Sequence, residues 1–188
     1  MKTIKKWELL STEDVSPSKW FPVEKHIVKL PSGEVVDDYY IGILGNVVMI
    51  LPITKNGNFI FVRQYKHAYD DILIELPAGF QQKGTTLFQS AVNELEEEIG
   101  VKTTEHNLEP IGKVTNNPTK TTHVTYGFMA RNLEYNSKQN LENTEDIEIL
   151  EISPAKVLEM VKNEELIVAD TISFIMKAYL LYPELFSR

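Results

Sequence analysis

One helix with a marked start and a marked end is the feature that most constrains the fold of this chain. Thr86 and Gln89 have the spacing of a capping box, in which each side chain bonds the backbone N–H of the other residue. Gly100 stands where the helix should end, because glycine takes the left-handed backbone conformation of a C-terminal cap without strain. The sequence therefore predicts a helix over residues 87–99.

This helix has an apolar side and an acidic side. At 100° per residue, Glu94, Glu97 and Glu98 fall within an arc of about 100°. Glutamates four positions apart repel by roughly 0.2–0.5 kcal/mol per pair, so their crowding suits either a solvated face or a bound hard cation such as Mg²⁺ or Mn²⁺. Glu96 points away from this arc, and we interpret it as solvated. The apolar side collects four residues: Phe88, Val92, Leu95 and Ile99.

Strand signals occupy much of the remaining chain. The Asn-Gly pair at residues 56–57 predicts a hairpin with strands over residues 46–54 and 59–65. Alternating apolar and polar residues on either side of Pro31–Gly33 predict a second hairpin between residues 24 and 41. Further strands are expected over residues 71–79, 108–114, 123–130 and 147–153.

Two later helices complete the pattern. Ser153 followed by Pro154 predicts a helix start, and this helix should extend to about Lys162. Asp170 is a candidate N-cap for a last helix that ends before Pro183. Strands outnumber helices and follow a mixed order, so the fold class is α+β rather than a doubly wound parallel sheet.

Composition excludes several classes of protein. The chain has 188 residues, 43% of them hydrophobic, and we divide it into a strand-rich segment at residues 1–43 and a main domain at residues 44–188. A net charge of −8 without a basic run argues against a nucleic-acid partner. The absence of cysteine excludes disulfides and thiolate metal sites, and it fits a cytoplasmic protein. No signal peptide or membrane-spanning segment is expected, since no apolar run reaches about 18 residues.

The stretch from Gly79 to Val101 resembles the Nudix box, which is a glycine, five residues, a glutamate, seven residues and then R-E-U-x-E-E-x-G-U, where U is bulky and apolar. Two positions depart from it, because Thr85 stands in place of the first glutamate and Asn93 in place of the arginine. The positions in register are Gly79, Glu94, Leu95, Glu97, Glu98, Gly100 and Val101.

The residues before the box are similar to the ADP-ribose and ADP-sugar pyrophosphatase branch of this family. Residues 75–79 read Glu-Leu-Pro-Ala-Gly, and residues 63–66 read Arg-Gln-Tyr-Lys where the branch has R-Q-Y-R. The resemblance covers roughly residues 24–182. It implies an α/β/α sandwich with a mixed β-sheet, preceded by a small N-terminal strand segment that serves dimerisation.

The resemblance also implies an activity. The expected reaction is divalent-metal-dependent hydrolysis of a nucleoside diphosphate linked to another moiety, most plausibly ADP-ribose or an ADP-sugar, to a nucleoside monophosphate and a sugar phosphate. Mg²⁺ or Mn²⁺ is the expected cofactor, and the expected partners are this small molecule and a second copy of the chain, without nucleic acid or membrane. The alternative is a catalytically weak Nudix-like domain that binds or senses a nucleotide, which the changes at Thr85 and Asn93 favour.

Carried over residue by residue, the resemblance assigns roles in the site. Glu97 and Glu98 are expected to serve catalysis together with Glu145, which would act as general base or orient the attacking water, with Glu142 as the alternative. The implied metal ligands are the backbone carbonyl of Ala78 and the carboxylates of Glu94, Glu97 and Glu98. The implied substrate contacts are Arg63, Gly79 and Pro118.

Several of these residues have a plain structural alternative. Arg63 could make a surface ion pair instead of a phosphate contact, and Pro118 could serve only as a loop constraint. Lys66 is as compatible with a solvated side chain as with a functional one. Trp7 and Trp20 could stack on an adenine, although packing in a core or an interface is the simpler interpretation.

Overall fold

The computed structural model describes residues 3–187. Residues 1–2 of the predicted N-terminal segment and residue 188 of the predicted main domain lie outside the described residues. The chain divides into two compact units. The smaller comprises Met1–Gly45 and Thr115–His123, and the larger comprises Asn46–Val114 and Val124–Arg188. Residues 115–123 thus belong with the N-terminal residues, whereas the sequence predicts a single division at residues 43 and 44.

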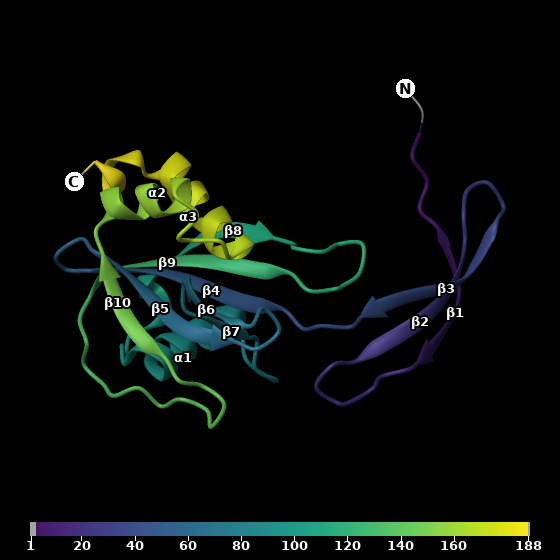
Figure 1. Cartoon of the computed structure of the whole chain (residues 1–188), viewed down its shortest axis with the longest axis horizontal. Coiled ribbons are helices and arrows are strands. Elements are labelled where there is room, and N and C mark those ends of the chain that lie inside the picture. The colour runs from purple at the N-terminus through teal and green to yellow at the C-terminus, as the bar shows by residue number, and fades with distance from the viewer. Residues whose placement is uncertain (1–2, 188) are drawn as a thin grey trace. The chain divides into compact units, whose positions relative to one another are not determined.

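A seven-stranded mixed sheet forms the centre of the larger unit (Figure 1). The strand order is β10-β5-β4-β9-β8, with β6 beside β5 and β7 beside β4. β4 and β9 run parallel, and the other neighbours in this sheet are antiparallel. The strands are β4 (Val47–Thr54), β5 (Phe59–Lys66), β6 (Asp71–Glu75), β7 (Ala78–Phe80), β8 (Leu108–Val114), β9 (Thr125–Leu133) and β10 (Glu148–Ile152).

Helices cover both faces of this sheet. Leu51 of β4 belongs to a buried cluster with Val157 and Phe174, whereas its neighbour Ile50 belongs to a second cluster with Leu95. Successive residues of a strand face opposite sides, so α1 packs on one face and α2 and α3 on the other (Figure 1). The predicted α+β class and the α/β/α sandwich are therefore confirmed. The helices are α1 (Leu87–Ile99), α2 (Pro154–Lys162) and α3 (Ala169–Leu181), with 3₁₀ turns at Glu105–Asn107 and Pro183–Phe186.

Both ends of α1 lie where the sequence predicts them. The Gln89 N–H donates to Thr86 Oγ1 at 3.1 Å, and the Thr86 N–H donates to Gln89 Oε1 at 2.9 Å. Gly100 ends the helix with φ 68° and ψ 34°. None of the helices within residues 3–187 is long and apolar enough to cross a membrane.

The hairpin predicted from the Asn-Gly pair is confirmed, but its strands take different partners beyond the turn. Gly57 has φ 84°, and its N–H donates to the Thr54 carbonyl at 2.9 Å. β4 and β5 pair at Ile53 and Phe59. Farther from the turn, β5 pairs with β6 and β10, whereas β4 pairs with β7 and β9.

The single strand predicted over residues 71–79 is wrong, because the chain breaks it into β6 and β7. Between them, the Leu76 N–H donates to Thr171 Oγ1 of α3 at 3.1 Å, and Pro77 has no N–H to offer a neighbouring strand. β6 pairs with β5 and β7 with β4. Because of the break, the chain pairs first with β5 and then with β4, and Ala78 lies beside α1.

The predicted N-cap of the last helix is also wrong. α3 begins at Ala169, with Val168 in the cap position. Asp170 lies in the first turn, where its carboxylate accepts a hydrogen bond from Thr125 Oγ1 at 2.6 Å. Asp170 thus ties α3 to β9 instead of capping its own helix.

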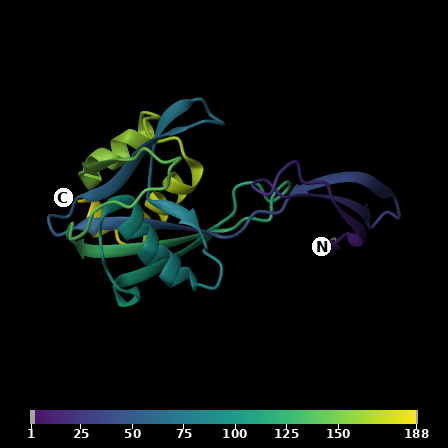
Figure 2. The ribbon, with the colours of Figure 1, turned by 90° about the horizontal axis from the view of Figure 1, so that it is seen from below.

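The smaller unit is a three-stranded antiparallel sheet in the order β1-β2-β3, with strands at Glu8–Asp14, Val23–Lys29 and Val35–Gly42. The hairpin of β2 and β3 was predicted, whereas β1 was not. Residues 115–123 lie beside β3 (Figure 2), since the Gly42 N–H donates to the Lys120 carbonyl at 2.7 Å and the Tyr39 hydroxyl donates to the Thr119 carbonyl at 2.7 Å.

Candidate active site

Two buried carboxylates lie one helical turn apart on α1. Glu94 is 8% exposed and Glu98 is 3% exposed. Burial, followed by the negative charges of Glu97, Glu145 and Glu142, raises the pKa of Glu94 to about 8. Burial and then the charge of Glu94 likewise raise the pKa of Glu98 to about 8. Such a pair holds negative charge at high cost, and a cation between its members would remove that cost.

The backbone of β7 packs directly against these two carboxylates. The Ala78 N–H donates to Glu98 Oε2 at 2.9 Å, which partly opposes the rise in the Glu98 pKa. A β-carbon at Gly79 would lie 2.1 Å from Oε1 of Glu94, far inside van der Waals contact. Gly79 therefore makes room for the Glu94 carboxylate, and its predicted contact with substrate stays a prediction.

The loop between β9 and β10 brings further carboxylates to the same place. The Glu142 N–H donates to Glu145 Oε2 at 2.9 Å, and the Glu145 N–H donates to the Glu142 carbonyl at 3.0 Å. Glu145 lies close enough to raise the pKa of both Glu94 and Glu98, and Glu142 acts on Glu94. The structure thus gathers the glutamates of the box helix and of this loop into one acidic site.

A sixth acidic residue belongs to this site, and the sequence analysis did not single it out. Glu75 is 8% exposed at the end of β6, and its charge contributes to the raised pKa of Glu98. Its Oε1 accepts a hydrogen bond from Gln64 Nε2 at 2.9 Å and pairs with Lys66 Nζ at 2.6 Å. In the sequence, Glu75 directly follows the apolar run Ile72–Ile74, and this position was the signal that could have marked it as a buried carboxylate. Lys66, left open above, therefore lies beside the carboxylates.

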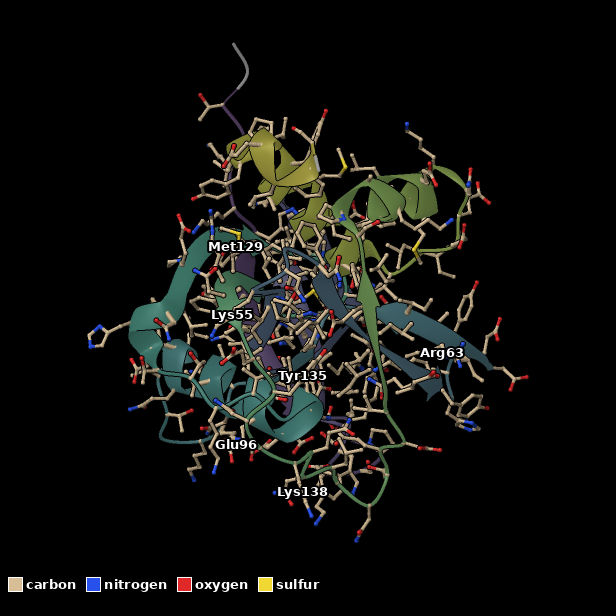
Figure 3. All side chains as sticks on the ribbon, turned by 90° about the vertical axis from the view of Figure 1, so that its left-hand side faces the viewer. Lys55, Arg63, Glu96, Met129, Tyr135 and Lys138 are labelled. Carbon is tan, nitrogen blue, oxygen red and sulfur yellow. The ribbon has the colours of Figure 1, made fainter. Side chains whose placement is uncertain are left out.

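Arg63 lies on the other face of the sheet. Phe61 packs in the cluster that contains Phe174 of α3, and Val62 packs in the cluster that contains Leu95 of α1. Side chains alternate along β5, so Arg63 follows Phe61 to the side of α2 and α3, away from the carboxylates of α1. In Figure 3, Arg63 lies on the opposite side of β10 from α1.

The guanidinium of Arg63 forms an ion pair with Glu148 on the neighbouring strand. It lines an open hollow of about 240 Å³, whose other lining residues are Tyr65, Ile72, Asp146 and Glu148. The ion-pair alternative given above for Arg63 is thus present in the structure. The phosphate contact expected of Arg63 stays a prediction.

The two departures from the Nudix box form a neutral hydrogen-bond network at the start of α1. Thr85 Oγ1 lies 2.6 Å from Ser90 Oγ and donates to the Gln82 carbonyl at 2.8 Å. Asn93 Nδ2 donates to Gln82 Oε1 at 2.7 Å. Gln82 thus connects the two positions, which in the family pattern carry opposite charges. The loop before α1 is held to the helix without any ion pair among these four residues.

The remaining predicted residues belong to the smaller unit. Pro118 lies in the segment that runs beside β3. Trp7 packs its ring edge against Tyr39, with the ring centroids 5.5 Å apart, and Trp20 is 81% exposed. A contact of Pro118 with substrate stays a prediction.

The donor atoms of the acidic site fit a hard divalent cation. Within residues 3–187, no three histidine, cysteine, aspartate or glutamate side chains are grouped so that they could hold a metal ion as they stand. Glu94 and Glu98 nevertheless supply two buried carboxylates whose pKa values are raised by burial and like charge, which is the environment that a cation relieves. The other two ligands that the resemblance implies, Glu97 and the backbone carbonyl of Ala78, stay a prediction.

Comparison with known proteins identifies the family of this chain. Residues 44–171 match the NUDIX domain, and residues 7–41 match the nucleoside diphosphate sugar hydrolase N-terminal domain. This chain belongs to the Nudix family. The predicted Nudix-type enzyme of the ADP-ribose pyrophosphatase-like branch is confirmed at this level. The match to these two family models begins at residue 7, whereas the resemblance was expected to begin near residue 24.

Three curated relatives match the chain. It is 27% identical over 172 residues to an ADP-ribose pyrophosphatase of Bacillus subtilis (strain 168), covering 91% of each protein. It is 24% identical over 166 residues to a methanol dehydrogenase activator of Bacillus methanolicus, covering 87% of each. It is 33% identical over 97 residues to an ADP-ribose pyrophosphatase of Mycobacterium tuberculosis (strain ATCC 25618 / H37Rv), covering 51% of this chain and 46% of the relative.

A solved structure confirms the fold. The crystal structure of an ADP compounds hydrolase matches with a TM-score of 0.85 over 98% of each chain, at 20% sequence identity.

Proposed function

We propose that this Nudix protein hydrolyses a nucleoside diphosphate linked to a further group, with ADP-ribose or an ADP-sugar as the preferred substrate, to a nucleoside monophosphate and a sugar phosphate. The observation that carries the proposal is the buried pair of Glu94 and Glu98, held against β7 and facing the loop of Glu142 and Glu145. The nucleoside diphosphate sugar hydrolase match at residues 7–41 and the two ADP-ribose pyrophosphatase relatives support the substrate class.

Mg²⁺ or Mn²⁺ is the proposed cofactor. Its ligands would be the carboxylates of Glu94, Glu97 and Glu98 and the backbone carbonyl of Ala78. When bound, the cation neutralises the charge of the diphosphate and makes the attacking water more acidic. The chain itself contributes a preformed carboxylate pair, fixed by the Ala78 amide and by the space that Gly79 leaves.

Glu145 is the proposed general base, with Glu142 as the alternative. Its carboxylate accepts a proton from water as the water oxygen bonds to phosphorus and the bridging P–O bond breaks. One phosphate leaves with the nucleoside and the other with the sugar. Lys66, paired with Glu75 on the carboxylate face, would neutralise a phosphate oxygen. A phosphate contact by Arg63 would require its side chain to leave Glu148 and the substrate to reach the opposite face of the sheet.

A second candidate is a nucleotide-binding protein with weak or no turnover. The observation in its favour is the neutral network of Thr85, Ser90, Gln82 and Asn93, which replaces the opposite charges of the family pattern. A neutral network holds the helix less firmly than charge-assisted hydrogen bonds. The binder would keep the fold and the acidic site without fast hydrolysis.

A screen of nucleoside diphosphate derivatives separates the two candidates. Each compound is incubated with the protein and Mg²⁺ or Mn²⁺, and a phosphatase that acts on the monophosphate products releases phosphate for detection. Hydrolysis of ADP-ribose or ADP-sugars above the other derivatives supports the proposal. Binding of a derivative without phosphate release from any of them supports the binder and overturns the enzyme.

The smaller unit is the proposed dimerisation surface. Several large apolar side chains on it are exposed although the unit has little core of its own: Trp7, Leu9, Leu10, Trp20, Phe21, Val35 and Tyr40. A small sheet with such a surface is stabilised when a partner covers it. We therefore propose a homodimer that pairs through this unit. The cytoplasmic location expected from the sequence stays a prediction.

A further inference from the structure

The segment that follows β9 closes over the C-terminal end of α1. The last carbonyl groups of a helix have no partner within the helix. Here the Asn140 N–H donates to the Glu97 carbonyl at 2.9 Å, and Gln139 Nε2 donates to the Glu98 carbonyl at 2.7 Å. These are the backbone groups of two residues whose side chains form the acidic site. The segment thus binds the helix where the site is built.

Gly100 allows this close approach. The Ser137 and Asn136 N–H groups donate to the Gly100 carbonyl at 3.0 and 3.2 Å. A β-carbon at Gly100 would lie 2.7 Å from the Ser137 carbonyl oxygen. Gly100 is therefore needed twice, for its left-handed backbone at the helix end and for the space in which residues 136–140 pack. In Figure 3, Lys138 of this segment and Glu96 of α1 both lie at the lower edge of the unit.

Gln139 also closes the base of the loop that carries Glu142 and Glu145. Besides its bond to the Glu98 carbonyl, Nε2 donates to the Ile147 carbonyl at 3.3 Å. Ile147 and Leu141 pack in the same hydrophobic cluster as α1. The loop between them therefore leaves α1 and returns to it over a short span, and Gln139 joins the two ends.

We propose that Gln139 is a positioning residue, whose side-chain amide clamps the loop of Glu142 and Glu145 onto α1 and so sets Glu145 over the carboxylates of Glu94 and Glu98. This inference rests on the proposed function, since it gives Glu145 its place in that reaction. A glutamine amide provides two N–H donors, and both acceptors here are backbone carbonyls. The clamp therefore needs a donor, and a side chain of equal size without one should release the loop.

The first test compares turnover of Gln139→Met with the wild type. Methionine keeps the length of the side chain and loses both donors. We expect kcat to fall about 10- to 100-fold, in the range for groups that orient a reacting residue, while the KM for substrate and the half-saturating Mn²⁺ concentration change by less than about twofold. Lys138→Ala, on the same segment, is the matched control and should behave like the wild type. Unchanged kcat in Gln139→Met overturns the proposal.

A double-mutant cycle then asks whether Gln139 acts through the loop glutamate. In a Glu145→Gln background, Gln139→Met should lower kcat by less than about twofold, because the carboxylate that Gln139 positions is already lost. If the two losses simply multiply, Gln139 acts by another route and the proposal is overturned.

Amide hydrogen exchange tests the clamp without any turnover. Gln139→Met should speed exchange in peptides that cover residues 136–147 by about tenfold or more, and leave the first turns of α1 unchanged. Unchanged exchange overturns the clamp even in an active enzyme. Faster exchange in a protein that hydrolyses none of the diphosphates supports the clamp and shows that the proposed function, not the clamp, has failed.

Discussion

Gly79 and Glu94 are in closer contact than any side chain at position 79 would permit. A β-carbon there would lie 2.1 Å from Oε1, 2.3 Å from Cδ and 2.5 Å from Oε2 of Glu94. The first residue of the Nudix box thus lies directly against the glutamate fifteen positions later. Because Gly79 has no side chain, the Glu94 carboxylate can occupy this space.

Gly79→Ala should weaken metal binding while the protein stays folded. The added methyl group must displace the Glu94 carboxylate, which is the far end of a flexible side chain, so the cost falls on the site more than on the backbone. We expect the half-saturating Mn²⁺ concentration to rise at least about tenfold. Gly42→Ala is the control, because its β-carbon would make ordinary contacts of 3.5 Å or more. Equal metal dependence in the two variants would contradict this role of Gly79.

Glu94→Gln and Glu98→Gln should each reduce turnover by at least about 100-fold at limiting Mg²⁺, since each removes a charge and a ligand from the site. The fold should survive, because glutamine fills the same volume. Glu96→Gln is the matched control on the same helix: Glu96 pairs with Lys102 at 3.1 Å and should be nearly silent. Near wild-type activity in either site variant, measured by the coupled phosphate assay, would rule out the metal assignment.

The metal-free protein should lose stability as the pH rises from about 4.5 to about 8. The pKa of Glu94 and of Glu98 is raised from 4.5 to about 8 in the folded chain. In this window the folded chain binds more protons than the unfolded chain, so the free energy of unfolding falls as protons are removed. Mn²⁺ should reverse this loss at pH 8 and release protons on binding.

Thermal unfolding after chelator treatment, measured at pH 5 and pH 8 with and without Mn²⁺, tests this prediction. Glu94→Gln should flatten the pH dependence, because one of the two raised groups is gone, and Glu96→Gln should leave it as in the wild type. A midpoint that Mn²⁺ raises equally at both pH values would show that the cation does not bind in place of these protons.

Restoring the family's opposite charges should strengthen the site. Thr85→Glu together with Asn93→Arg should raise activity at low Mg²⁺ by more than the two single changes combined, because either charge alone disturbs the neutral network with Ser90 and Gln82. The double-mutant cycle is measured as kcat/KM at limiting Mg²⁺. No gain in the double variant, together with no hydrolysis by the parent, would favour the binder.

The N-terminal unit should hold two chains together. Light scattering at micromolar concentration should give about 43 kDa, twice the 21.5 kDa of one chain. Val35→Lys with Tyr40→Lys places two charges among the exposed apolar side chains of β3 and should shift the protein toward 21.5 kDa. A wild-type mass of 21.5 kDa at that concentration would exclude the proposed homodimer.

Local sequence determined α1 and most of the strands. The capping box of Thr86 and Gln89 and the glycine at position 100 act within one turn of the helix, so their effect can be predicted without the rest of the chain. The spacing of Glu94, Glu97 and Glu98 likewise places them on one side of α1 whatever the helix packs against. These residues also carry most of the resemblance to the Nudix box.

Only the tertiary structure decided which residues of separate strands, helices and loops contact one another. The break at Leu76 depends on Thr171 of α3, and the buried position of Glu75 depends on Gln64 and Lys66 of the neighbouring strand. Gln139 binds α1 about forty residues away along the chain. Such partners are chosen by the register of strands and the packing of helices, whose energies come from contacts distant in sequence, and for this reason no local pattern predicts them.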